Sequence, residues 1–207
     1  MSWIENVPYD KATGRLKTLY DRIRLPDGSI DHVMMVHSLR PHTMEGHMAL
    51  YKNVLYHTGN KLPSWFLESI GAYVSVLNGC TYCTAHHFEG LIRLIEDHDR
   101  AISICGALAA DDPAHAFDGK ELLAMQYARA LTVDPRSVGQ QWVADLRKVG
   151  YSDGEILEIN QVTAYFAYAN RTVMGLGVTT RGEIVGASPN VTDDPDAWGH
   201  TMAKPVD

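Results

Sequence analysis

The sequence is poor in cysteine, in positive charge and in long apolar runs, and each shortage excludes a class of protein. Three cysteines in 207 residues are too few for a disulfide-stabilised scaffold. No apolar run approaches the roughly 20 residues that span a bilayer, so we expect no membrane segment. The first residues, Met1 to Asn6, lack a basic stretch followed by an apolar one, which predicts no secretory signal. These absences indicate a cytoplasmic protein.

Acidic residues outnumber basic ones. Lys and Arg number 18 and Asp and Glu number 25, which gives a net charge of −7. Because counterion release needs clustered cations, we expect no nucleic-acid partner. The chain also has no Gly-rich phosphate loop, so we expect no bound nucleotide, no other cofactor and no metal.

Strand-like alternation is nearly absent, and apolar residues recur at helical spacing instead. We therefore predict an all-α fold with one helical domain, residues 1–181, whose motif core spans 63–97, followed by an irregular C-terminal arm, residues 182–207. Ser152 and Glu155 have the spacing of a capping box. Helices are expected at about 10–24, 30–39, 41–55, 64–77, 80–96, 100–110, 119–132, 135–150 and 152–174.

The most informative stretch is Cys80-Thr81-Tyr82-Cys83, a C-x-x-C pair that is followed by His87. Residues three and four apart lie on one face of a helix, so Cys80, Cys83 and His87 would share a stripe. Both cysteines fall in the first turns of this helix, where unpaired N–H groups and the macrodipole favour negative charge. The position predicts a lowered thiol pKa, and the thiolate is the reactive form.

Glu68 joins this group if the chain reverses at Asn78-Gly79 to form a helix hairpin. Glu68 lies about ten residues before that turn and His87 about eight after it, so the two side chains would lie at similar depth. The carboxylate would then orient the imidazole. Small residues on the two facing stripes would let the helices approach closely: Ala72, Ser75, Gly79, Thr84 and Gly90.

This geometry predicts a thiol redox cycle. His87 would take the proton of Cys83, and the Cys83 thiolate would attack a hydroperoxide oxygen and become a sulfenic acid. Cys80 would condense with that sulfenic acid to form a disulfide. An external thiol would reopen the disulfide by exchange.

Other interpretations of the same residues stay open. Two thiolates, an imidazole and a carboxylate could hold zinc, although ligands this close on one helix crowd a tetrahedral site. Glu68 could merely complement a helix dipole. Glu68 and His87 could also serve as acid and base in a decarboxylase, a reaction with no use for two thiols. Finally, the pair could be a redox sensor in a non-catalytic helical oligomer.

The pattern of Glu68, eleven residues, Cys80-x-x-Cys83, three residues and His87 resembles the motif of the AhpD-like alkylhydroperoxidases. These belong to the carboxymuconolactone decarboxylase superfamily, and the likeness is closest to its uncharacterised peroxidase-related branch. The resemblance covers roughly residues 40–178. Beyond the motif, it rests on segments 76–83, 164–171 and 175–178.

The resemblance implies an AhpD-like helical fold that assembles into a homotrimer or homohexamer. It implies Cys83 as the peroxidatic cysteine and Cys80 as its resolving partner, with Glu68 and His87 as a proton relay. The best-known member is reduced by a lipoylated protein, so a lipoyl-type reductant protein is an expected partner. Tyr82 stands where that member has a histidine, which implies a weaker relay or another substrate.

Five other histidines and the third cysteine are expected to have structural rather than catalytic roles. His86 would point about 100° away from His87 and is expected at the surface or an interface. Cys105 is expected to be a small buried apolar residue. Four N-terminal histidines are expected to be surface or hydrogen-bonded side chains: His32, His37, His42 and His47.

Overall fold

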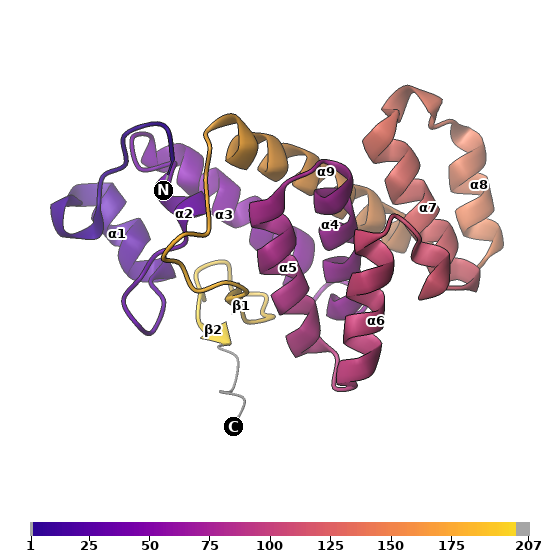
Figure 1. The fold of residues 1–207 in the computed structure, drawn as a ribbon. Coiled ribbons are helices and arrows are strands. Elements are labelled where there is room, and N and C mark those ends of the chain that lie inside the picture. The colour runs from indigo at the N-terminus through magenta and orange to yellow at the C-terminus, as the bar shows by residue number, and fades with distance from the viewer. Residues whose placement is uncertain (1, 202–207) are drawn as a thin grey trace.

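The computed structural model describes residues 2–201, and within them the regular secondary structure is almost all helical, as predicted (Figure 1). None of the described helices is long and apolar enough to cross a membrane. Two short strands, β1 (Ser188–Pro189) and β2 (His200–Thr201), pair antiparallel. The α-helices are α1 (Gly14–Ile23), α2 (His32–Met35), α3 (Pro41–Leu55), α4 (Ser64–Leu77), α5 (Thr81–Leu94), α6 (His98–Ala109), α7 (Gly119–Val133), α8 (Gln140–Lys148) and α9 (Asp153–Gly175).

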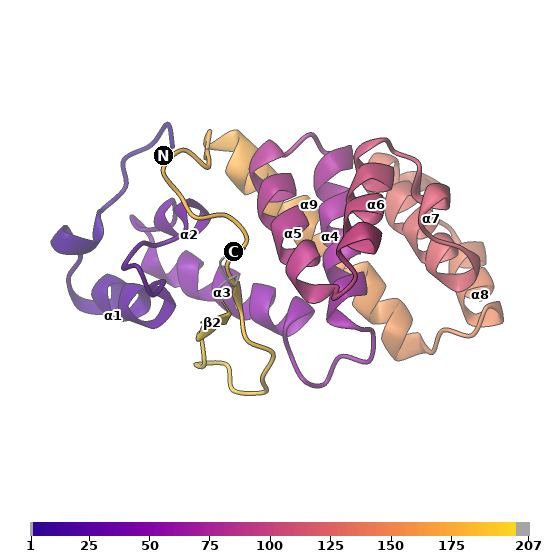
Figure 2. The ribbon, with the colours of Figure 1, turned by 60° about the horizontal axis from the view of Figure 1, so that its bottom comes forward.

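Helix α4 is the centre of the molecule. Every residue from Phe66 to Ser75 is buried. The helix packs against α5, α6, α7 and α9, which surround it in Figures 1 and 2. A helix buried on all sides is normally apolar on all sides. Glu68 in its middle is therefore exceptional, because ionisable side chains are seldom fully buried without a partner.

Helices α4 and α9 approach closely at Gly71. A Cβ atom at this position would overlap the ring of Phe166 on α9, so the residue must be glycine for this packing. One turn further along, Asn170 donates to the Ser75 hydroxyl at 3.1 Å and accepts from the Asn78 amide at 2.9 Å. These contacts fix α9 against the end of α4 where the α4–α5 turn begins.

The N-terminal helices α1–α3 form a second apolar cluster, at the opposite end of the molecule from α7 and α8 (Figure 2). Met34, Met44 and Met48 fill this cluster, as expected for core methionines. Trp198 enters it from the C-terminal segment. The ammonium group of Lys52 donates to two backbone carbonyls of the same segment, which ties that segment to α3.

Three helix predictions are wrong in their bounds. The helix expected over 10–24 begins at Gly14, because Tyr9–Lys11 forms a separate 3₁₀ turn and Thr13 is the N-cap of α1. The helix expected over 135–150 begins at Gln140, because Pro135 opens only a short 3₁₀ turn and Gly139 provides the N-cap of α8. The helix expected over 30–39 is the single turn α2, and it is followed by turns. The predicted capping box of α9 is confirmed, with both reciprocal bonds between Ser152 and Glu155.

Candidate active site

The hairpin between α4 and α5 is closed by a Schellman motif. Gly79 adopts φ +71°, a left-handed conformation that favours glycine. The N–H of Cys80 donates to the carbonyl of Ser75, and the N–H of Gly79 donates to the carbonyl of Val76, both at 2.9 Å. The chain therefore reverses where the sequence predicted, and Cys80 becomes the N-cap of α5.

The two cysteines of the pair lie in contact at the start of α5. Both thiols are free and buried, and their Sγ atoms are 2.7 Å apart. The Sγ of Cys80 also accepts the N–H of Cys83 at 3.4 Å. A disulfide bond is ~2.05 Å long, so oxidation of this pair requires a movement of less than about 1 Å.

The two thiols differ in acidity. The pKa of Cys80 is lowered because the Cys83 thiol donates to its sulfur, while burial opposes the shift. The pKa of Cys83 is raised by the same hydrogen bond and by burial, although the Asn170 amide acts in the opposite direction. The first negative charge on the pair therefore rests on Cys80, with the proton between the two sulfurs.

Glu68 and His87 meet across the hairpin. The Nδ1 atom of His87 donates to the Oε2 atom of Glu68 at 2.6 Å, and the Glu68 side chain is 1% exposed. The hydroxyl of Tyr56 donates to the other carboxylate oxygen. A Cβ at Gly90 would lie 3.6 Å from this carboxyl group, an ordinary van der Waals contact, so α5 packs directly against Glu68 at this position. With Nδ1 held by the carboxylate, the Nε2 atom of His87 is the one able to accept a proton.

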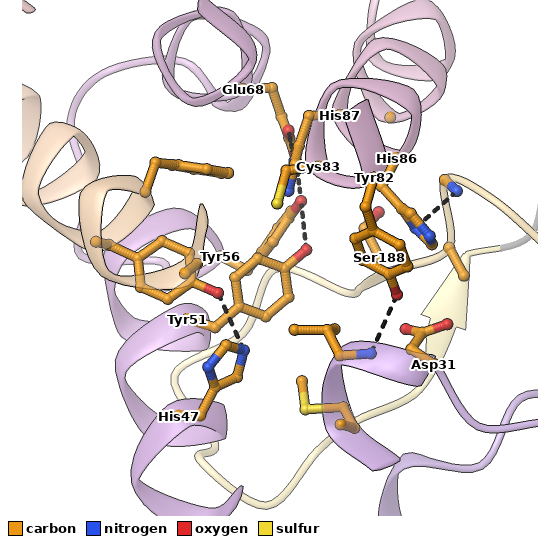
Figure 3. Close-up of a pocket in the computed structure, with 18 residues that line it drawn as sticks. Asp31, His47, Tyr51, Tyr56, Glu68, Tyr82, Cys83, His86, His87 and Ser188 are labelled. Atoms are coloured by element: carbon orange, nitrogen blue, oxygen red, sulfur yellow. Dashed lines mark hydrogen bonds and ion pairs between the residues drawn. The ribbon is translucent and has the colours of Figure 1, made fainter. Parts of the chain in front are cut away.

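A cavity of about 50 Å³ lies between these groups (Figure 3). It could hold a few water molecules or a solute of similar size. Cys83 lines it, together with Glu68 and His87. The other lining residues come from α3 and the following turn, α5, α9, the segment around α2 and the C-terminal segment: Asp31, Val33, Met34, His47, Tyr51, Tyr56, Tyr82, His86, Gly90, Tyr165, Phe166, Ala169, Gly186, Ala187 and Ser188.

His86 corrects a prediction, because it is buried rather than at the surface. Its ring packs against that of Tyr82 with 4.5 Å between centroids. Its Nδ1 atom accepts the N–H of Gly186 at 3.3 Å. The C-terminal segment therefore covers the face of α5 that carries His86, which the sequence predicts to lie at the surface or an interface.

Glu183 anchors that segment. Its carboxylate accepts the Tyr82 hydroxyl at 2.6 Å and the backbone N–H of His32 at 2.8 Å. The imidazole of His32 lies 3.0 Å from the second oxygen. Burial disfavours the charged form, but the interactions with His32, His86 and Tyr82 outweigh it and hold the pKa of Glu183 at about 2. Tyr82 therefore serves to fix the segment that covers the cavity.

Sequence reasoning placed four residues near each other and missed the rest of the cavity wall. Cys80, Cys83, His87 and Glu68 are brought together as expected. The missed residues of the wall are Asp31, Tyr56 and the aromatic side chains of α3 and α9, which no local spacing connects to the motif. Glu183, which holds the C-terminal segment against Tyr82, was missed as well.

The N-terminal histidines and Cys105 fall largely as expected. His47 is buried and accepts the Tyr165 hydroxyl at 3.2 Å, and its ring lies 5.1 Å from that of His37. His42 is exposed, and Cys105 is buried. Among the described residues, no three His, Cys, Asp or Glu side chains are arranged to hold a metal ion.

No protein-family model matches the chain, and no curated protein matches it in sequence. Solved structures do match its fold. An uncharacterised peroxidase-related protein from Ralstonia eutropha JMP134, described as an alkylhydroperoxidase AhpD core, is 17% identical over 86% of this chain and 91% of that chain, with a TM-score of 0.74. A peroxidase-related protein from Silicibacter sp. TM1040 is 19% identical over 86% and 87%, with a TM-score of 0.67.

The same fold also occurs in the debrominase Bmp8. A cysteine-to-alanine variant of Bmp8 in complex with 2,3,4-tribromopyrrole is 16% identical over 86% of this chain and 93% of that chain, with a TM-score of 0.68. Identities this low establish the fold alone. The AhpD-like helical fold that the sequence motif implied is thus confirmed.

Proposed function

We propose that this protein is a thiol-dependent hydroperoxide reductase. The observation that carries the proposal is the position of Cys83. Its sulfur lines a small cavity and lies 2.7 Å from a second thiol, and the Glu68–His87 pair lines the same cavity. This arrangement places a nucleophile and a base on the wall of one cavity, with a resolving thiol in contact with the nucleophile.

The reaction proceeds in two steps. The Cys83 thiolate attacks the terminal oxygen of the hydroperoxide, an S–O bond forms, and the O–O bond breaks. Sulfur loses two electrons to become a sulfenic acid, and the departing oxygen gains them and a proton to become an alcohol. Cys80 then attacks the sulfenic sulfur, which releases water and leaves a disulfide.

The acidity of the pair adds one step to this cycle. Because the pKa of Cys80 is lowered and that of Cys83 is raised, Cys80 ionises first and the shared proton lies on Cys83. Transfer of that proton across the sulfur–sulfur hydrogen bond exposes the Cys83 thiolate to the cavity. His87, polarised by Glu68, takes up the proton that the pair releases overall.

An external thiol must reopen the disulfide by exchange. A small dithiol or a lipoyl-type reductant protein has the required chemistry. A homotrimeric or homohexameric assembly in the cytoplasm belongs to the same proposal and rests on the sequence resemblance.

Cavity size favours a peroxide over a larger substrate. About 50 Å³ is enough for hydrogen peroxide or a short alkyl hydroperoxide. A bulky ring such as tribromopyrrole would have to extend beyond this space. The alternative of an acid–base decarboxylase leaves the contact between the two thiols without a role.

A peroxide-consumption assay tests the proposal. Reduced wild-type protein should consume hydrogen peroxide with dithiothreitol or dihydrolipoamide as donor, and Cys83→Ser should lose the activity. Cys105→Ser is the matched control, because Cys105 is a buried thiol on α6 and should be dispensable. Consumption by Cys83→Ser at the wild-type rate would contradict the proposal.

A further inference from the structure

Asp31 has a carboxyl group on the cavity wall that the proposed reaction does not use. It occupies the N-cap position of α2, yet its side chain makes no capping hydrogen bond. It lines the same cavity as Cys83. Part of the residue reaches the surface, but its Oδ1 atom is buried and has no hydrogen-bond partner among the described residues. A buried polar atom without a partner is costly, so an acid turned into a reaction cavity points to a role there.

The surroundings of Asp31 favour its protonated form. Burial is the largest cause and raises the pKa of this carboxyl group to about 7. Glu183 on the C-terminal segment and Asp27 in the same loop add negative charge, whereas His86 on α5 and His32 on α2 oppose the shift. The carboxyl group can therefore donate a proton near neutral pH.

The direction of attack decides which group meets the departing oxygen. In a displacement at oxygen, the sulfur, the attacked oxygen and the departing oxygen lie roughly in line. The departing oxygen is therefore on the side away from Cys83. His87 follows Cys83 by one turn of the same helix and lies on the sulfur's side. Figure 3 shows Asp31 near α2, on a different wall of the cavity from the one that carries Cys83.

We infer that Asp31 is the general acid that protonates the oxygen leaving from the hydroperoxide, an inference that rests on the proposed function. As the O–O bond breaks, the proton of Asp31 passes to the alkoxide or hydroxide, which leaves as alcohol or water. The Asp31 carboxylate then regains a proton from water. His87 acts on the thiol, and Asp31 acts on the leaving group.

The test compares peroxides whose leaving groups differ in their need for a proton. Hydrogen peroxide and ethyl hydroperoxide release strongly basic oxygens, whereas peracetic acid releases acetate, which needs none. Asp31→Asn keeps the shape of the side chain but cannot protonate the leaving group. Asp99→Asn, which changes an exposed carboxyl group on α6, is the control. The readout is the single-turnover rate of disulfide formation, measured by quenched flow and intact mass.

We expect Asp31→Asn to react about 100-fold more slowly with hydrogen peroxide and ethyl hydroperoxide. Its rate with peracetic acid should stay within a few-fold of wild type, which also shows that the variant is folded. Equal losses with all three oxidants, or no loss with any, would overturn the role of Asp31 and leave the proposed function standing. A wild-type protein that forms no disulfide with any of the three would overturn both.

Discussion

The Nδ1 atom of His87 and the Oε2 atom of Glu68 lie 2.6 Å apart across the α4–α5 hairpin, although the residues are 19 positions apart in the chain. This contact joins the most buried carboxyl group of the central helix to the imidazole beside the thiol pair. Its effect is to fix the ring and to stabilise the imidazolium that forms when His87 takes a proton.

Replacing Glu68 by Gln should slow disulfide formation with hydrogen peroxide by about 100-fold. The Gln oxygen can still accept from Nδ1, but it lacks the charge that stabilises the imidazolium. The shape of the pH–rate profile should also change, because the substitution alters the base, His87. A merely structural effect would lower the rate and leave the shape of the profile unchanged. Glu89→Gln, an exposed carboxylate on α5, is the control. A Glu68→Gln rate within twofold of wild type would refute the relay.

Gly186 tests whether the C-terminal segment limits access to the cavity. A Cβ atom there would overlap Glu89 on α5, and the backbone has φ +81°. Gly182 has a similar φ of +78° but open space around it, so Gly182→Ala reproduces the backbone strain without the overlap. We expect Gly186→Ala to push the segment off α5 and to raise the rate with cumene hydroperoxide relative to hydrogen peroxide several-fold. Equal rate ratios in the two alanine variants would exclude a gating role.

His47 should make the protein less stable in mild acid. Burial, with a smaller contribution from His37, lowers its pKa from 6.5 to about 3. The unfolded chain therefore binds the proton more tightly between these values, and stability falls as the pH drops through that window. From about pH 7.5 to about pH 5, His47 alone should contribute a loss of about 2 kcal/mol. The raised pKa of Asp31 acts in the opposite direction over this range, so the contribution of His47 is measured by urea unfolding as a difference between the wild type and a His47 variant.

The variant His47→Gln isolates this effect. Between the two pH values its stability should change by about 2 kcal/mol relative to the wild type, in the direction of greater stability at pH 5, whereas His42→Gln, on the exposed face of α3, should follow the wild type. An unchanged pH dependence in His47→Gln would show that other groups cause the acid sensitivity.

Substitution of Gly71 tests the close packing of α4 against α9. Its replacement by Ala should destabilise the protein by about 1–3 kcal/mol, because the added Cβ would overlap the Phe166 ring. Gly106→Ala is the matched change, on exposed helix α6 with nothing within 4 Å of its Cβ, and should be stabilising by about 0.5–1 kcal/mol. Thermal unfolding of both variants measures the contrast. Similar shifts in the two would contradict the close approach.

The sequence predicted what local spacing determines. The turn at Gly79, the helical stripe of Cys80, Cys83 and His87, and the capping box at Ser152 all depend on residues a few positions apart. Glu68 could be added because a short turn fixes the depth of two neighbouring helices.

The remaining cavity wall depends on contacts between distant parts of the chain. Glu183 bonds to Tyr82 from 101 positions away and to His32 from 151. The segment that carries Glu183 has no periodic pattern, so nothing in its composition pointed to α5. His86 was misassigned for the same reason, because the helix face it occupies is covered only by that segment.

The most direct test of the thiol cycle is the intact mass of two variants, each with one cysteine of the pair replaced by serine, after brief exposure to peroxide. Cys80→Ser should gain one oxygen at Cys83 as a trapped sulfenic acid, because Cys83 lines the cavity and has lost its resolving partner. Cys83→Ser should remain unmodified, and the wild type should lose two hydrogens. Oxidation of Cys80 in the Cys83→Ser variant at the rate seen for Cys83, or no oxidation in either, would contradict this account.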